Sequence, residues 1–178
     1  MQKKKLWRLL RKQAFFRRRI KLSSGKISNY YIDVRRVSLT GEGIYLISHL
    51  IWDLIKNEKV TAIGGPTLGA DPIIGGVCFL AYKNRKKLKG FIVRKTPKKY
   101  GERKLIEGAT LSSKDRVVLI DDVATTGSSL LKAIEILKRE NVRVVKIIVV
   151  VDRKEGARQL FSNLDYPFLA LFTRDDFL

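Results

Sequence analysis

Short apolar runs and segments with helical spacing of apolar residues alternate through most of this chain. Runs that are typical of buried strands occupy residues 60–63, 91–93, 117–120, 144–151 and 167–172. Between them, helices are expected over residues 41–57, 70–82, 130–137 and 157–164. This alternation over residues 41–172 predicts an α/β fold in which a central, mostly parallel sheet is flanked by helices.

The N-terminal part of the chain follows a different pattern. In residues 3–18, Leu6, Leu10 and Ala14 fall on one helical face, and Lys and Arg fill most of the rest. This predicts an amphipathic helix packed on the body of the protein, with a helix lying on a membrane surface as the alternative. A turn over 22–26 leads into a β-prone run.

That β-prone run covers residues 28–35. We expect residues 1–38 to form a small N-terminal hood and residues 39–178 the core, within a single domain over 1–178. A length of 178 residues and a hydrophobic fraction of 45% suit one domain with a sizeable core.

Composition points to a cytoplasmic protein outside the membrane. The one cysteine, Cys78, cannot form an internal disulfide, which favours a reducing compartment. No apolar run approaches the roughly 20 residues of a membrane span. The N-terminus lacks the apolar region of a signal peptide.

The net charge of +20 is unusual and is concentrated in two windows. Residues 1–21 hold ten Lys and Arg and no acid, and residues 83–104 hold eleven and one acid, Glu102. Such charge suits a nucleic acid, a substrate with several phosphates, or a protein from a high-temperature organism. Because no aromatic motif is interleaved with the charges, nucleic acid is not expected as a partner.

Residues 116–131, RVVLIDDVATTGSSLL, combine a strand, two acids, a loop of small residues and the start of a helix. A loop that opens a helix offers unpaired amides and the positive end of the helix dipole to a phosphate. The segment lacks the Gly-Lys-Ser/Thr ending of the P-loop. Asp121 and Asp122 can accept hydrogen bonds from ribose hydroxyls or hold the waters of Mg²⁺. The plainer alternative is a solvated acidic turn before a capped helix.

Three more polar segments follow predicted strands. Residues 64–70, GGPTLGA, form a second glycine-rich turn before a helix. Residues 94–108 form a long charged loop, for which a solvated hairpin is the plain alternative. Asp152 and Arg153 end the strand over 144–151, where a simple ion pair is the alternative. Ligands of parallel sheets bind at the carboxyl ends of the strands, so these segments are expected to converge on one site.

These segments resemble a known family. VVLIDDVATTGSSL is similar to the motif with which the type I phosphoribosyltransferases bind phosphoribosyl diphosphate (PRPP). LSSGKISNYYIDVRR and RKTPKKYGERKLIEG resemble the N-terminal signature and the catalytic loop of the orotate phosphoribosyltransferases. The likeness spans residues 20–156 and implies transfer of ribose 5-phosphate from PRPP to orotate, a step of pyrimidine synthesis.

The resemblance also implies roles for individual residues. Lys98 would be the catalytic residue. PRPP would be bound by Arg94, Lys95, Lys98, Tyr100, Asp121, Asp122, Val123, Ala124, Thr125, Thr126, Gly127, Ser128 and Ser129. Thr125 and Arg153 would bind orotate. Tyr100 stands where many members have His, and Gly69 where some have Lys.

The family resemblance further implies Mg²⁺ carried on the diphosphate of PRPP, without a direct protein ligand. It implies a homodimer in which the mobile loop reaches the neighbouring subunit's site. A PRPP-binding regulator of nucleic acid and a phosphoribosyltransferase for another base remain as alternatives.

Overall fold

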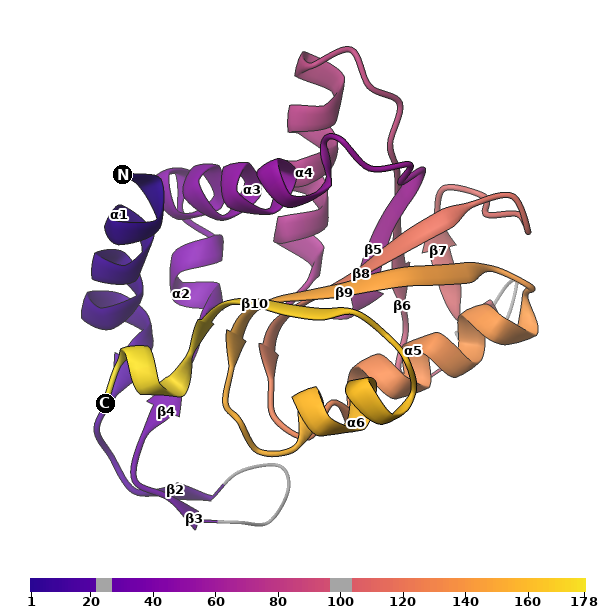
Figure 1. Cartoon of the computed structure of the whole chain (residues 1–178). Helices are drawn as coiled ribbons and strands as arrows, with labels where there is room; N and C mark the ends of the chain where they lie inside the picture. Colours follow the sequence, from indigo (N-terminus) through magenta and orange to yellow (C-terminus); the bar gives the residue numbers. More distant parts are fainter. Residues whose placement is uncertain (22–26, 97–103) are drawn as a thin grey trace.

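A six-stranded sheet lies at the centre of the protein (Figure 1). The computed structural model describes residues 1–21, 27–96 and 104–178. The strands are β5 (Ala62–Pro66), β6 (Lys89–Val93), β7 (Ile106–Gly108), β8 (Arg116–Ala124), β9 (Arg143–Asp152) and β10 (Phe168–Thr173). In the order β10-β9-β8-β5-β6-β7, all neighbours are parallel except β6 and β7. The predicted fold class is confirmed.

Helices cover both faces of this sheet. α3 (Gly41–Ile55) and α4 (Asp71–Lys83) lie on one face, and α5 (Ser128–Arg139) and α6 (Ala157–Asn163) on the other (Figure 1). Successive side chains of a strand point to opposite faces. In β8, Val118 therefore packs in the cluster under α3 and α4, and Leu119 in the cluster under α5 and α6. This double coverage explains why the strands read as continuous apolar runs.

The N-terminal segment consists of short elements. They are α1 (Gln2–Leu9), the π-helical turn η1 (Leu10–Ala14), β1 (Phe15–Phe16), β2 (Ile20–Lys21), β3 (Ile27–Ser28), β4 (Tyr31–Ile32) and α2 (Arg35–Ser38). The predicted helix over 3–18 ends at Ala14, because Phe15 takes an extended conformation and β1 pairs with β4. The predicted β-run over 28–35 is reduced to short pieces, and α2 already begins within it.

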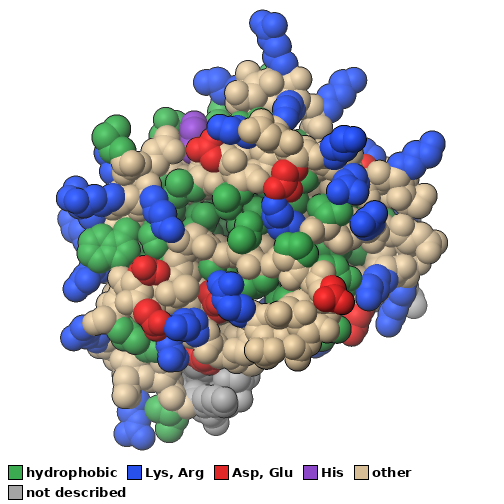
Figure 2. Space-filling view, in the orientation of Figure 1, with side chains coloured by type: hydrophobic (Ala, Val, Ile, Leu, Met, Phe, Trp, Pro, Cys, Tyr) green, Lys and Arg blue, Asp and Glu red, His purple; other side chains and the backbone are tan. Residues whose placement is uncertain are grey.

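α1 is strongly basic on its outer side. Lys4, Lys5 and Arg8 are exposed, whereas Leu6 is fully buried. The first turn of α1 contains no acidic residue. Lys and Arg side chains also project from the top, left and right edges of the face shown in Figure 2. The excess positive charge is thus spread over the surface as well as along α1.

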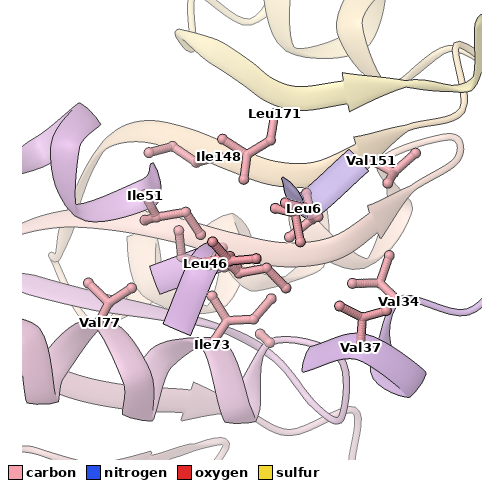
Figure 3. Packing of buried hydrophobic residues seen from close by; sticks show 14 of the residues in the cluster. Leu6, Val34, Val37, Leu46, Ile51, Ile73, Val77, Ile148, Val151 and Leu171 are labelled. Atoms are coloured by element: carbon pink, nitrogen blue, oxygen red, sulfur yellow. The ribbon is translucent and has the colours of Figure 1, made fainter. Parts of the chain in front are cut away.

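The hood shares one apolar cluster with α3, α4 and a face of the sheet. Leu6, Val34 and Val37 lie in the same group of side chains as Ile73 and Val151 (Figure 3). The hood is therefore packed into the main core and not set apart from it. Since the apolar face of α1 is buried, a helix inserted into a membrane surface is excluded. Within the described ranges, no helix combines the length and apolar character needed to cross a bilayer.

The C-terminal end is fastened to this same region. After β10, the short helix η2 (Arg174–Asp176) brings Phe177 onto Phe15, with ring centroids 5.8 Å apart. The indole Nε1 of Trp7 donates a hydrogen bond of 2.7 Å to the carbonyl oxygen of Asp176. The two ends of the chain consequently lie on one flank of the molecule (Figure 1).

Candidate functional site

Two adjoining cavities open at the carboxyl ends of the parallel strands, with volumes of about 250 and 630 Å³. Their linings share five residues, so they form one continuous site: Pro66, Lys95, Asp121, Val123 and Ser129. The smaller cavity adds residues of the hood and of the loop after β5. The larger cavity adds residues 124–130 and one side of α5. The sequence-predicted convergence of β5, β6 and β8 is therefore found.

The loop between β8 and α5 has the geometry of a phosphate site. Gly127 has a φ of +83°, in the left-handed region that favours glycine. A Cβ added to Gly127 would lie 2.8 Å from the ring of Phe161, which is fully buried. Among the described residues, no side chain caps the first turn of α5. Its amides and the helix dipole are thus available to an anion in the larger cavity.

The acidic pair lies within β8, not in a loop after it. The strand continues to Ala124, and Asp121 pairs with Val149 of β9. The plain alternative, a solvated acidic turn, does not describe this position, because Asp121 is only 9% exposed. Each carboxylate accepts a backbone hydrogen bond from the next residue: Asp122 N donates to Asp121 (2.9 Å), and Val123 N donates to Asp122 (2.8 Å).

Burial is the main influence on the pKa values of these two carboxyl groups. It raises the pKa of Asp121 well above its ordinary value, and the neighbouring charge of Asp122 raises it further. Burial likewise raises the pKa of Asp122. Lys95 opposes the shift at Asp121, and Arg35 opposes it at Asp122. A buried and a half-buried carboxylate at a cavity wall are suited to a ligand that brings hydroxyl donors or a cation.

The glycine-rich turn after β5 closes tightly over the acidic pair. Gly69 lies so near Asp122 that an added Cβ would be 2.2 Å from its Oδ1. Position 69 therefore has no room for a side chain while Asp122 keeps this place. The peptide bond between Thr67 and Leu68 is cis. The predicted anion-binding turn thus lines the smaller cavity with residues 66–69.

The charged loop is part of a hairpin formed by β6 and β7. Arg94 N donates to the carbonyl oxygen of Leu105 (2.8 Å), and the Arg94 Nη1 forms an ion pair with Glu107 (3.3 Å). Arg94 lines the larger cavity, and Lys95 lines both. Lys98 and Tyr100 lie outside the described residues. The described residues on either side of 97–103 pair as a hairpin, and the binding-loop interpretation stays a prediction.

Arg153 lies at the end of β9, under the hood. Its guanidinium donates to Glu155 Oε1 (2.9 Å) and to Ser28 Oγ (3.2 Å), and its Cζ is 4.5 Å from the ring centre of Tyr30. It is 3% exposed and belongs to neither cavity lining. The plain alternative, an ion pair between Asp152 and Arg153, is not found, since the carboxylate of Asp152 faces Arg158 at 3.5 Å.

Thr125 and Arg153 come close through the backbone. Arg153 N donates to the carbonyl oxygen of Ala124 (2.9 Å), and Ala157 N donates to that of Thr125 (3.2 Å). Thr125 lines the larger cavity together with Thr126 and Ser128. The two residues expected to bind the base are thus neighbours at the strand ends.

Sequence reasoning did not assign Asp33 and Arg35, which line the smaller cavity, or Ser28 and Tyr30, which cover Arg153. All four lie in the N-terminal signature that resembles the family. The only available signal was their position in that signature, because their approach to β8 and β9 depends on the fold.

The described residues contain no group of three or more His, Cys, Asp and Glu arranged to hold a metal. Mg²⁺ commonly keeps several waters and uses one or two carboxylates together with substrate phosphates. Asp121 and Asp122, with raised pKa values at the cavity wall, fit a cation that arrives with such ligands.

Comparison with known proteins agrees with this fold. Residues 42–163 match the family model described as a phosphoribosyl transferase domain. The orotate phosphoribosyltransferase of Aquifex aeolicus is 38% identical over 100% of this chain and 98% of its own length. The enzyme of Mycobacterium tuberculosis in complex with Fe(III) dicitrate has a TM-score of 0.86 at 31% identity, covering 99% of both chains.

A second structure of the M. tuberculosis enzyme, in complex with PRPP, has a TM-score of 0.81 at 29% identity and again covers 99% of both chains. The fold and the site thus define a phosphoribosyltransferase. Within that class, the chain belongs to the orotate phosphoribosyltransferase family.

Proposed function

We propose that this protein transfers ribose 5-phosphate from PRPP to orotate, which gives orotidine 5′-monophosphate and diphosphate. The observation that carries the proposal is the meeting of a helix N-terminal loop, a buried acidic pair and a basic hairpin in one continuous site. Each of these parts suits one portion of PRPP. The Mycobacterium tuberculosis structure with PRPP supports this choice of donor.

The 5′-phosphate is bound by the amides and hydroxyls of residues 125–129, where the α5 dipole adds to the attraction. Val123 and Ala124 form the floor beneath it. Asp121 and Asp122 accept hydrogen bonds from the ribose hydroxyls. Those bonds also compensate the carboxylates for their burial.

The diphosphate gains negative charge as the glycosidic bond breaks, so cations aimed at it lower the barrier. Lys98 is the main catalytic residue in this proposal, with Arg94, Lys95 and Tyr100 as further contacts to PRPP. The nucleophilic ring nitrogen of orotate can already be anionic. A strong general base is therefore not required.

Orotate is bound by Thr125 and Arg153, whose planar guanidinium matches a carboxylate. Since Tyr30 and Ser28 cover this guanidinium, we expect this part of the hood to shift when orotate enters. Asp121 and Asp122 would lie next to Mg²⁺ carried on the diphosphate, and the ion would supply neutralisation of phosphate charge there.

We further infer a homodimer with shared sites, a cytoplasmic location and a single domain over residues 1–178. Large apolar side chains are exposed on and beside α3 and α4, which supports a partner surface there: Leu39, Tyr45, Leu68, Phe79 and Tyr82. The single Cys78 supports a reducing compartment.

Turnover of orotate with PRPP and Mg²⁺ tests the proposed reaction directly. Lys98→Ala should lower kcat by orders of magnitude while PRPP still binds. Lys87→Ala, an exposed lysine outside both cavities, is the matched control. Full activity of Lys98→Ala would contradict the assigned role, and absence of turnover by the wild type would contradict the reaction.

Shared sites are tested by complementation. Subunits carrying Lys98→Ala are refolded together with subunits carrying Asp122→Asn. If the loop of one subunit completes the other's site, mixed dimers contain one intact site and regain activity. A mixture as inactive as its parts, in a preparation shown to contain mixed dimers, would contradict the arrangement.

A further inference from the structure

A cationic side chain of the hood, Arg35, lines the smaller cavity. Its charged lining residues are Asp33, Arg35, Lys95, Asp121 and Asp122. Arg35 opens α2 in the hood, whereas the acidic pair lies on β8, so the two walls of the cavity come from different parts of the chain. Both Arg35 and Asp122 line this cavity; burial raises the pKa of Asp122, and the charge of Arg35 opposes that rise.

Within the described part of the chain, one side-chain hydrogen bond orients this arginine. The Arg35 Nε donates to Asp33 Oδ1 at 2.8 Å. The guanidinium has five N–H donors in a fixed fork, and this bond uses only the Nε donor. The Arg35 side chain is 44% exposed, so a solute in the cavity can reach it. An arginine that is held by one edge in this way suits the oxygens of a phosphate.

The turn after β5 cannot supply a cation to the same cavity. Position 69 has no side chain, and the carboxylate of Asp122 takes up the space where a Cβ would lie. The turn therefore offers only backbone groups and the hydroxyl of Thr67 to an anion. Arg35, from the hood, and Lys95, after β6, line the same cavity and provide the positive charge that this loop lacks.

We propose that Arg35 contacts the diphosphate of PRPP in the smaller cavity and that Asp33 positions it there. The inference rests on the proposed function, which places the diphosphate next to Asp121 and Asp122. In this proposal, α2 contributes a residue that binds PRPP. The hood then contributes to leaving-group binding as well as to covering the base, because Tyr30 and Arg35 lie five residues apart in one short segment.

The test compares Arg35→Gln with Arg36→Gln by calorimetric titration with inorganic diphosphate and Mg²⁺, and separately with ribose 5-phosphate. Arg36 is the matched control, because its guanidinium lies 4.8 Å from the ring centre of Phe16 and lines neither cavity. A charged hydrogen bond is worth about 1.5–3 kcal/mol, so Arg35→Gln should weaken diphosphate binding by roughly ten- to a hundredfold. Its affinity for ribose 5-phosphate should stay within about twofold of the wild type.

Two further variants separate contact from folding. Arg35→Lys keeps the charge but loses the fork and should bind diphosphate with intermediate affinity. Asp33→Asn keeps an acceptor oxygen and should lose less than Arg35→Gln. Both should melt within a few degrees of the wild type.

Unchanged diphosphate affinity in Arg35→Gln would overturn the proposal, and so would equal losses in the Arg35 and Arg36 variants. A wild type that binds diphosphate in an Arg35-dependent way but does not turn over orotate would refute the proposed reaction alone.

Discussion

Replacing Gly127 by alanine tests the phosphate loop most directly. At φ +83°, an L-residue with a Cβ costs roughly 1–2 kcal/mol. The new methyl would also lie 2.8 Å from the ring of the fully buried Phe161, and overpacking of this kind typically costs about 1–3 kcal/mol. If the loop keeps its shape, the free energy of unfolding should therefore fall by about 2–5 kcal/mol.

Two glycines of the same chain separate these contributions. Gly156 has a φ of +119° but no atom within 4 Å of an added Cβ, so Gly156→Ala should show the conformational cost alone, about 1–2 kcal/mol. Gly75, in the exposed part of α4 with open space around it, should gain up to about 1 kcal/mol as alanine. Urea unfolding at pH 7 measures all three.

The affinity of Gly127→Ala for ribose 5-phosphate tests the function of the loop. If the loop relaxes to relieve Phe161, the amides at the start of α5 move, and the affinity for ribose 5-phosphate should fall at least tenfold. Phe161→Leu in the Gly127→Ala background should recover about 1 kcal/mol of stability in a double-mutant cycle. Equal losses for Gly127→Ala and Gly156→Ala, with unchanged affinity for ribose 5-phosphate, would refute this account of the loop.

Three other predictions concern charge. Burial alone would raise the pKa of Asp115, but hydrogen bonds from Lys89, Thr61 and Ser112 lower it to about 2. A carboxyl whose pKa is lower in the folded than in the unfolded state stabilises the fold above its unfolded-state pKa, and this stabilisation is lost as the pH falls. The free energy of unfolding should therefore fall by about 2 kcal/mol between roughly pH 4 and pH 2, and this loss should be absent in Asp115→Asn. The pKa of Asp121 is raised, so the folded state binds the proton of this carboxyl more tightly than the unfolded state does, and the free energy of unfolding falls as the pH rises. Asp121→Asn should therefore be more stable than the wild type at neutral pH while losing activity. Because the first turn of α1 holds lysines and no acid, raising NaCl to about 0.5 M should raise the urea midpoint, and Lys4→Glu should reduce that dependence.

Much of the core could be predicted from sequence, because it depends on local pattern. The strands over 117–120 and 144–151 are covered on both faces, so nearly every residue in them is apolar. The phosphate loop could be found for a similar reason. A strand, small residues and a helix follow each other directly, and Gly127 marks the place where the backbone must turn.

Features that depend on distant partners were missed or misplaced. The first helix ends at Ala14 because Phe15 and Phe16 pair with Tyr31 and Ile32, which no local pattern reveals. β8 continues through the acidic pair because β9 pairs with it there. Arg35 looks like any surface arginine until α2 is placed against the smaller cavity.

The attachment of the C-terminal end to the hood has a consequence for how the protein is made. Phe15 is synthesised long before Phe177, on which it stacks. The Trp7 indole likewise must wait for the carbonyl of Asp176. During translation the nascent N-terminal segment therefore lacks its final packing partners. The substrate-covering part can therefore settle only after the segment around Phe177 has been made, and a chain stalled before that segment would be left open there.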